Sequence, residues 1–126
     1  MYCEDVDLNW RAQRAGWKCI YVPDAVVYHH LSATGGGSLA SYYVGRNTLW
    51  VIARNYPGRL LWRNLGRIAR AQARIAWQAM RSWRGAAARA RLRGQLVGLV
   101  TCWRWLPYRW RQPLRVSVDE LETILA

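Results

Sequence analysis

The sequence predicts an α/β fold class: a mixed first part is followed by a helical second part. Two short runs rich in β-branched and aromatic residues, at 17–23 and 25–30, lie between helical patterns and predict strands. From residue 59 onward, apolar and basic residues recur instead with the 3.6-residue period of a helix. The pattern changes at the pair Pro57-Gly58, so we divide the chain into residues 1–57 and 58–126.

The first predicted element is a helix from Asp5 to Gly16. An aspartate can cap a helix, and further acids in the first turn suit the positive end of the helix dipole. Glycine is the usual residue just beyond a helix end. Leu8, Ala12 and Ala15 have the spacing i, i+4 and i+7, which predicts one apolar face.

After the two predicted strands, residues 31–38 (LSATGGGS) form an expected loop, because three consecutive glycines have no side chains to pack. A flexible loop of this kind can close over a bound substrate. The same sequence is equally typical of an ordinary surface loop. A helix is then predicted from Leu39 to Asn55.

The second part is predicted to begin with a strongly amphipathic basic helix over residues 59–84. Its arginines are separated by 4, 4, 3, 4, 7 and 3 residues, which gathers them on one side of a helix. We call these the basic stripe: Arg59, Arg63, Arg67, Arg70, Arg74, Arg81 and Arg84. A second helix is expected over 86–105, and a short terminal helix over 117–125 with a capping box from Ser117 to Glu120.

Composition limits the classes of function. The 126 residues include 19 basic and 7 acidic ones, and a net charge of +12 favours polyanionic partners such as nucleic acid, anionic lipid or phosphorylated substrates. Three widely spaced cysteines without a CxxC pair argue against a disulfide framework and a zinc site. The sequence shows neither a signal-peptide pattern nor an apolar run long enough to span a bilayer.

Three of the seven acids, Glu4, Asp5 and Asp7, gather in one short stretch at the start of the chain. Helix capping is the simplest interpretation. Capping needs only one acid, however, and a third one nearby adds mutual repulsion. That repulsion weakens the capping interpretation.

The ordered stretch YCEDVDLNWRAQRAGWKCIYVPDAVVYHHLSATGGG, followed by YYVGRNTLW, resembles the second half of family 2 glycosyltransferases, particularly bacterial rhamnosyltransferase-like members. The shared features are an E-D-x-D-L motif, then P-x-A-x-x-x-H, a Ser/Thr loop and an Arg-Asn pair. The resemblance is close over about residues 2–57 and looser beyond. It implies the C-terminal part of a GT-A (Rossmann-like) domain, followed here by basic amphipathic helices.

The resemblance also implies roles for single residues. Asp5 would be the base that deprotonates the acceptor hydroxyl, with Glu4 beside it. Asp7 would hold the site by accepting hydrogen bonds, one of them from Arg11. His29 would help to bind a divalent cation, Mg²⁺ or Mn²⁺, on the donor diphosphate, and His30 is the less suitable ligand of the pair.

Asp7 and Arg46, together with Ser32 and Thr34 of the loop, would contact substrate. For His29 a structural hydrogen bond is the alternative role, and for Arg46 a solvated charge on a helix is the alternative.

The implied activity is inverting transfer of a sugar from a nucleotide-diphosphate-sugar donor to a glycan or lipid-linked acceptor in cell-envelope polysaccharide synthesis. The nucleotide-binding half of such an enzyme has no counterpart in this sequence, so we expect the chain alone to be inactive. The alternative is a small basic protein without catalytic activity that binds a membrane surface or nucleic acid.

Three interpretations compete for residues 58–115. Arginines on one side of a helix and Leu, Ile and Trp on another are typical of a helix that lies on an anionic membrane surface. Nucleic-acid binding, which we consider the less favoured partner, would use the same arginines on phosphates and aromatic rings on bases. Packing against another domain is the third interpretation. We expect peripheral attachment at the cytoplasmic face of the cell membrane.

Overall fold

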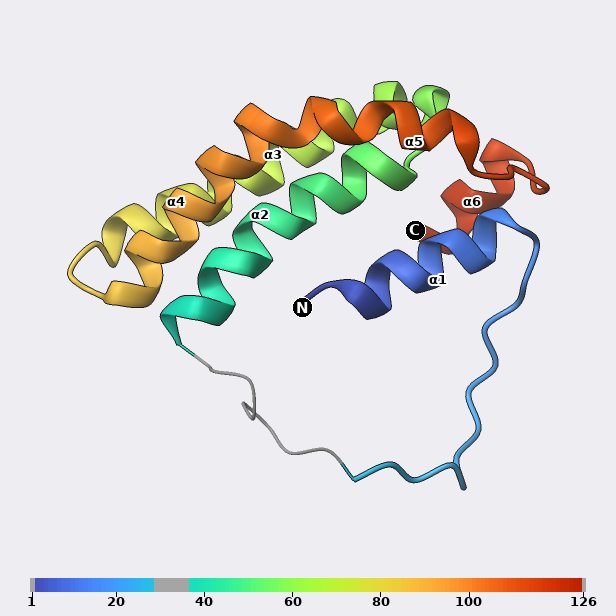
Figure 1. Cartoon of the computed structure of the whole chain (residues 1–126), viewed down its shortest axis with the longest axis horizontal. Helices are drawn as coiled ribbons and strands as arrows, with labels where there is room; N and C mark the ends of the chain where they lie inside the picture. Colours follow the sequence, from blue (N-terminus) through green and yellow to red (C-terminus); the bar gives the residue numbers. More distant parts are fainter. Residues whose placement is uncertain (1, 29–36, 126) are drawn as a thin grey trace.

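The computed structural model describes residues 2–28 and 37–125. Within these ranges the elements in chain order are α1 (Glu4–Arg14), α2 (Ser38–Asn55), α3 (Gly58–Arg81), α4 (Ala86–Thr101), the 3₁₀ helix η1 (Cys102–Trp105), α5 (Leu106–Arg111) and α6 (Val118–Leu125). The three long helices α2, α3 and α4 lie side by side, and α1 and α6 lie together below one end of them (Figure 1). The helix predicted for residues 39–55 is confirmed, and the one predicted for 59–84 is confirmed as far as Arg81.

Helices α2 and α4 approach one another at glycines. A Cβ atom added at Gly45 would lie 2.7 Å from a backbone oxygen of α4, and one added at Gly98 would lie 2.9 Å from a backbone oxygen of α2. A Cβ atom at Gly94 would collide with the carbonyl of Tyr42. The absence of side chains at these positions lets the two backbones touch, as small residues do at close helix crossings.

A small core lies where α1, α3 and α6 meet the end of α2. It is built around Trp10, Leu60 and Leu121, all of them buried. The Trp10 ring packs on Tyr56, with ring centroids 4.5 Å apart. Further apolar side chains pack against this cluster: Val51, Val116 and Val118. One aromatic pair and two leucines thus connect elements from both ends of the chain.

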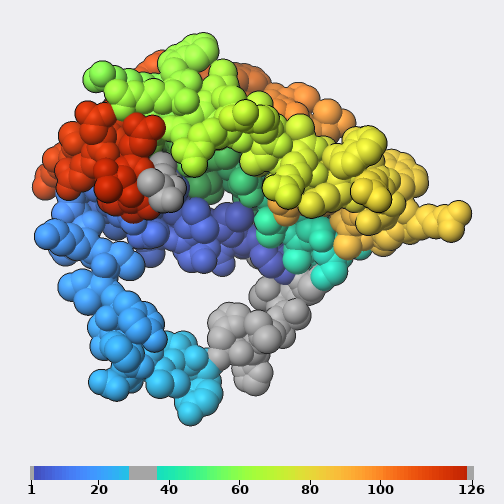
Figure 2. Space-filling model, turned by 180° about the vertical axis from the view of Figure 1, so that it is seen from behind, coloured from blue at the N-terminus to red at the C-terminus, as the bar shows by residue number. Residues whose placement is uncertain are grey.

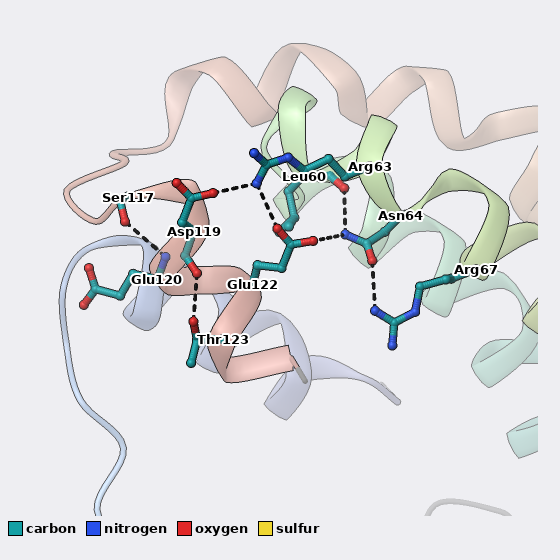
Figure 3. A network of polar contacts seen from close by, with 9 residues as sticks. All are labelled: Leu60, Arg63, Asn64, Arg67, Ser117, Asp119, Glu120, Glu122 and Thr123. Atoms are coloured by element: carbon teal, nitrogen blue, oxygen red, sulfur yellow. Dashed lines mark hydrogen bonds and ion pairs between the residues drawn. The ribbon is translucent and has the colours of Figure 1, made fainter.

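Helix α6 is attached to α3 by charged groups as well as by Leu121. Arg63 donates to Asp119 at 2.6 Å and to Glu122 at 2.9 Å (Figure 3). At the start of α6, the backbone N–H of Glu120 donates to the Ser117 hydroxyl at 3.1 Å. The predicted terminal helix and its serine cap are therefore confirmed.

The start of α1 differs from the prediction. The residue before the helix is Cys3, which has φ 65°, and Asp5 lies inside the first turn without a side-chain capping bond. The predicted apolar face is wrong as well, because Leu8 is 60% exposed. The buried side of α1 carries Trp10 and Arg14 instead, since a tryptophan buries more apolar surface than the predicted alanines.

The end of α1 agrees with the prediction. Gly16 has φ +85°, a conformation that glycine adopts readily. The N–H of Trp17 donates to the carbonyl of Ala12 and the N–H of Gly16 to that of Gln13, both at 3.0 Å. This is the bonding of a Schellman motif, which satisfies carbonyls at the end of a helix.

The predicted strands at 17–23 and 25–30 are not formed over residues 17–28, the part of them that the structure describes. Apolar side chains in this segment are largely exposed, Tyr28 by 95% and Tyr21 by 85%. A strand requires a neighbouring strand for its backbone hydrogen bonds, and the described residues offer this segment none. The GT-A fold class stays a prediction, since it concerns a sheet that this segment would join.

The single helix predicted over 86–105 is divided. Helix α4 ends at Thr101, η1 follows, and α5 begins at Leu106 with Pro107 in its first turn, where a missing N–H is tolerated. Within the described ranges, 2–28 and 37–125, no helix has both the length and the apolar character needed to cross a bilayer.

Candidate functional site

A pocket of about 390 Å³ opens between the first turn of α1, the middle of α2 and Trp105. Three residues that the sequence predicted for the site, Glu4, Asp7 and Arg46, line it. The other lining residues are Tyr2, Cys3, Tyr43, Asn47, Trp50, Val51, Arg54 and Trp105. The pocket thus combines two carboxylates, two guanidinium groups and several aromatic rings, a set of groups suited to a polar ligand with an anionic group.

Asp7 is a carboxylate of the site that is held by several hydrogen bonds. Its Oδ1 accepts a hydrogen bond of 2.8 Å from Asn55, and its Oδ2 accepts one of 3.1 Å from Arg11 and one of 3.5 Å from Arg54. The bond from Arg11 is the one expected from the i, i+4 spacing. The Asp7 side chain is only 15% exposed. Because Asn55 and Arg54 belong to α2, these bonds connect α1 to the end of α2. Its predicted contact with substrate stays a prediction.

Arg46 is held at the pocket by the aromatic residues of its own helix. Its guanidinium carbon lies 4.0 Å from the ring centroid of Trp50, 4.8 Å from that of Tyr43 and 5.6 Å from that of Tyr42. Its Nε donates to Asn47 at 3.0 Å. Cation–π contacts hold the charge beside the pocket at little cost in hydration. Arg46 therefore differs from a fully solvated helix charge.

The wall opposite α1 is aromatic and carries a second arginine. The rings of Trp50 and Trp105 lie 5.3 Å apart, and the indole N–H of Trp50 donates to Thr101 at 2.8 Å. The guanidinium of Arg54 lies over Trp105 and Tyr108, at 5.5 Å and 5.8 Å from their centroids. Sequence reasoning missed this group because its members come from α2, α4, η1 and α5, and no local motif unites them.

Asp5 lies on a different face of α1 from the other two acids. It lines a separate pocket of about 410 Å³ together with Asn9, Gln13 and Ile124. Successive residues of a helix point about 100° apart, so neighbours in the sequence can open onto different surfaces. Asp5 and Glu4 are both exposed. The structure therefore does not bring all three acids into one pocket.

The Cys3 thiol also lines the main pocket. Burial raises the pKa of this thiol, and a hydrogen bond with Thr48 acts in the opposite direction. Since the thiolate is the reactive form of cysteine, a raised pKa makes Cys3 a poor nucleophile. The backbone carbonyl of Cys3 accepts the first helical hydrogen bond of α1, from the N–H of Asp7 at 3.0 Å.

Two buried arginines close the far end of the α1–α2 junction. Arg14, which is 3% exposed, donates to the carbonyls of Asn55 at 2.6 Å, Arg109 at 3.0 Å and Gln112 at 3.3 Å. Arg109 donates twice to the carbonyl of Ala53, at 3.1 Å and 2.8 Å. Burial lowers the pKa of both guanidinium groups, and the charge of Arg109 lowers that of Arg14 further.

The sequence alone assigned no role to Arg14. Asp7, Trp10 and Arg14 are spaced i, i+3 and i+7, so they share a face of α1 as regularly as the apolar residues that were expected there. That spacing was the available signal. A pattern defined by apolar residues alone does not include it, because two of its three members are charged.

His29, Ser32 and Thr34, which the sequence placed in the site, lie outside the described residues. Within residues 2–28 and 37–125, no three His, Cys, Asp or Glu side chains gather as metal ligands would. The divalent cation stays a prediction.

Comparison with known proteins gives one kind of similarity. Two curated relatives carry the name N-acetylglucosaminyl-diphospho-decaprenol L-rhamnosyltransferase, from Mycobacterium tuberculosis strains CDC 1551 / Oshkosh and ATCC 25618 / H37Rv. Each is 40% identical to this chain over 60 residues, which cover 46% of this chain and 20% of the relative. No family model and no solved structure matches the chain. The similarity indicates a glycosyltransferase-type relationship over that stretch.

Proposed function

We propose that residues 1–57 are the acceptor-side part of an inverting family 2 glycosyltransferase with a GT-A fold. The sugar would come from a nucleotide-diphosphate-sugar and go to a hydroxyl of a glycan or lipid-linked acceptor of the cell envelope. The observation that carries this proposal is the 40% identity over 60 residues to a rhamnosyltransferase. The exposed apolar side chains of residues 17–28 support it, because two strands that join a larger sheet would need such surfaces.

In the proposed reaction Asp5 is the base. Its carboxylate takes the proton of the acceptor hydroxyl while the hydroxyl oxygen attacks the anomeric carbon, and the nucleoside diphosphate leaves with the bonding electron pair. Exposure of Asp5 supports this role, since its oxygens are accessible to an acceptor. Asp7 is the poorer candidate, because three donors already engage its oxygens.

Asp5 opens onto a separate pocket, so the main pocket would bind polar groups of a substrate that lie away from the reacting hydroxyl. Arg46 is held at the main pocket by aromatic rings and would offset part of the charge of an anionic group there. Glu4 lines the same pocket and would accept hydrogen bonds from sugar hydroxyls. Trp50 and Trp105 supply apolar faces of the kind on which sugar rings pack.

A chimera tests this proposal, since the aligned stretch is 20% of the relative's length. The 60 similar residues of the mycobacterial rhamnosyltransferase are replaced by those of this chain. Transfer of rhamnose from a nucleoside-diphosphate donor to N-acetylglucosaminyl-diphospho-decaprenol is then measured. We expect the chimera to be active and Asp5→Asn to lower kcat by about 100-fold or more.

Asp24→Asn is the matched control, an exposed aspartate outside α1, and should leave kcat unchanged. A folded but inactive chimera would contradict the proposed function. Equal rates for Asp5→Asn and Asp24→Asn would remove Asp5 as the base. If Glu4→Gln alone abolishes transfer, the base belongs to the main pocket instead.

A further inference from the structure

The outer side of α3 exposes an apolar stripe next to the basic stripe. Trp62 is 77% exposed, and Leu65, Trp77 and Met80 are exposed along the same side. At 100° per residue these four side chains fall within about 120° of one another, turned away from the buried Leu60. Helix α3 extends for about 36 Å at 1.5 Å per residue, and it runs along the surface of the molecule in Figure 2.

Helix α4 and the start of η1 carry a second exposed apolar stripe. Leu96, Leu99, Val100 and Trp103 are all exposed and have the spacing i, i+3, i+4 and i+7. Leu96 points about 160–200° away from Gly94 and Gly98, the residues that face α2. This stripe therefore lies on the side of α4 opposite to α2.

The two stripes form one surface. Helices α3 and α4 are connected by a short turn, are in contact and run antiparallel, and the Gln95 side chain donates to Gln72 at the contact. Around each helix axis, the stripe of α3 and the stripe of α4 both follow that contact on the side away from α2. We call this the outer apolar surface. Continuous exposed apolar areas of this kind mark interaction sites in proteins.

Positive charge borders the outer apolar surface on both edges. The exposed basic stripe follows the α3 edge, and Arg93 and Arg104 follow the α4 edge, also exposed. Residues 58–116 contain fourteen arginines and no acidic residue. An apolar centre between arginine borders matches an anionic lipid surface, in which acyl chains lie beneath charged headgroups.

We propose that the outer apolar surface docks α3 and α4 flat on a bilayer containing anionic lipid. The inference concerns lipid binding alone and does not rest on sugar transfer. Trp62 and Trp77 lie at the depth of the headgroups, and the aliphatic side chains reach the acyl boundary. The arginines other than Arg63, which is paired with α6, contact lipid phosphates.

Two other occupants fit these observations less well. A second copy would bring two arginine borders together, and the nearby carboxylates of α6, Asp119 and Glu122, are already paired with Arg63. A nucleic acid could use the arginines, but exposed Leu96, Leu99 and Val100 offer it nothing, because aliphatic side chains do not stack on bases. Trp62 and Trp77 are also separated by about 22 Å of helix, far beyond the spacing of neighbouring bases.

The test is flotation of the full chain with vesicles of phosphatidylcholine, with and without an equal share of phosphatidylglycerol. We expect binding only to the vesicles that contain phosphatidylglycerol, and weaker binding in high salt. Arg70→Gln with Arg74→Gln should weaken it by about 25-fold, since each arginine near an anionic surface contributes about fivefold. Leu96→Ser with Leu99→Ser should weaken it by about tenfold.

Controls match each pair. Lys18→Gln with Arg115→Gln removes the same charge, and Ile20→Ser with Val27→Ser removes exposed aliphatic groups elsewhere; both should bind like the unmodified chain. The substituted side chains are exposed, so circular dichroism should show unchanged helix content in every variant.

An equal loss in test and control pairs would overturn the proposed surface. A second combination of results would also overturn it: a single-stranded oligonucleotide displaces the chain from vesicles, and the variant Leu96→Ser with Leu99→Ser binds vesicles normally. These two results together would identify nucleic acid as the partner.

Discussion

The junction of α1, α2 and α5 and the outer side of α3 and α4 use arginine in opposite ways. At the junction, Arg14 and Arg109 are buried and donate to backbone carbonyls. On the outer side, Arg70 and Arg74 are exposed beside exposed tryptophans. The same residue type therefore serves the fold in one region and is available to an external partner in the other.

Helix ends account for the difference. The last carbonyls of a helix lack partners within the helix, and α2 and α5 both end beside Arg14. A guanidinium offers five N–H donors, so one side chain can satisfy several of these carbonyls while the negative ends of the helix dipoles offset its charge. In the middle of α3 every carbonyl is already bonded along the helix, which leaves an arginine there no internal acceptor.

The largest effect should come from removing the buried guanidinium. Arg14→Met fills a similar volume but leaves the carbonyls of Asn55 and Arg109 without donors, so we expect a loss of about 3 kcal/mol of unfolding free energy. Urea denaturation followed by circular dichroism measures it. Arg74→Met on the exposed side should change stability by no more than about 0.5 kcal/mol. Equal losses in the two variants would show that burial does not separate the two regions.

A second contrast concerns two glycines in helices. Gly94 of α4 faces α2, where an added Cβ atom collides with the Tyr42 carbonyl, whereas Gly66 of α3 has no atom within 4 Å of such a Cβ. Gly94→Ala should therefore cost about 1–3 kcal/mol through overpacking. Gly66→Ala should add about 0.5–1 kcal/mol, because alanine favours the helix. Thermal unfolding of both variants gives the signs, and a stabilised Gly94→Ala would contradict the close α2–α4 approach.

The parts of the fold that the sequence predicted are those determined locally. The period of the basic stripe correctly predicted α3, and the Ser117–Glu120 pattern correctly predicted the start of α6. Gly16 correctly predicted the end of α1. The predicted strands depend instead on distant partners. Residues 17–28 have a high propensity for strands, but a strand forms only beside a partner strand. The described residues offer them none.

The candidate site was predictable only in part for the same reason. Glu4, Asp7 and Arg46 line one pocket, as a functional cluster requires, but Asp5 opens onto another face. Spacing along one helix predicts which residues share a face. It does not predict that Trp105, from a separate element, lines the pocket. Nor does it predict which carbonyls accept hydrogen bonds from the buried Arg14.

The smallest expected effect lies between the two regions, at Arg63. This arginine belongs to the exposed basic stripe, yet it donates to Asp119 and Glu122 of α6 (Figure 3). The hydrogen bond from Arg63 lowers the pKa of Asp119 below its ordinary value of 3.8. A carboxylate with a lowered pKa stabilises the folded state above the ordinary value, and this contribution disappears as the pH falls through the lowered one.

Carboxyl chemical shifts measured by NMR against pH should therefore place the midpoint for Asp119 below 3.8. In Arg63→Gln the midpoint should move up toward that value, because the hydrogen bond and the nearby positive charge are both removed. Arg70→Gln removes an arginine of the same stripe that is not bonded to α6, and should leave the midpoint in place. If both variants shift the midpoint of Asp119 equally, the combined charge of the basic stripe lowers its pKa, and the direct hydrogen bond from Arg63 adds nothing.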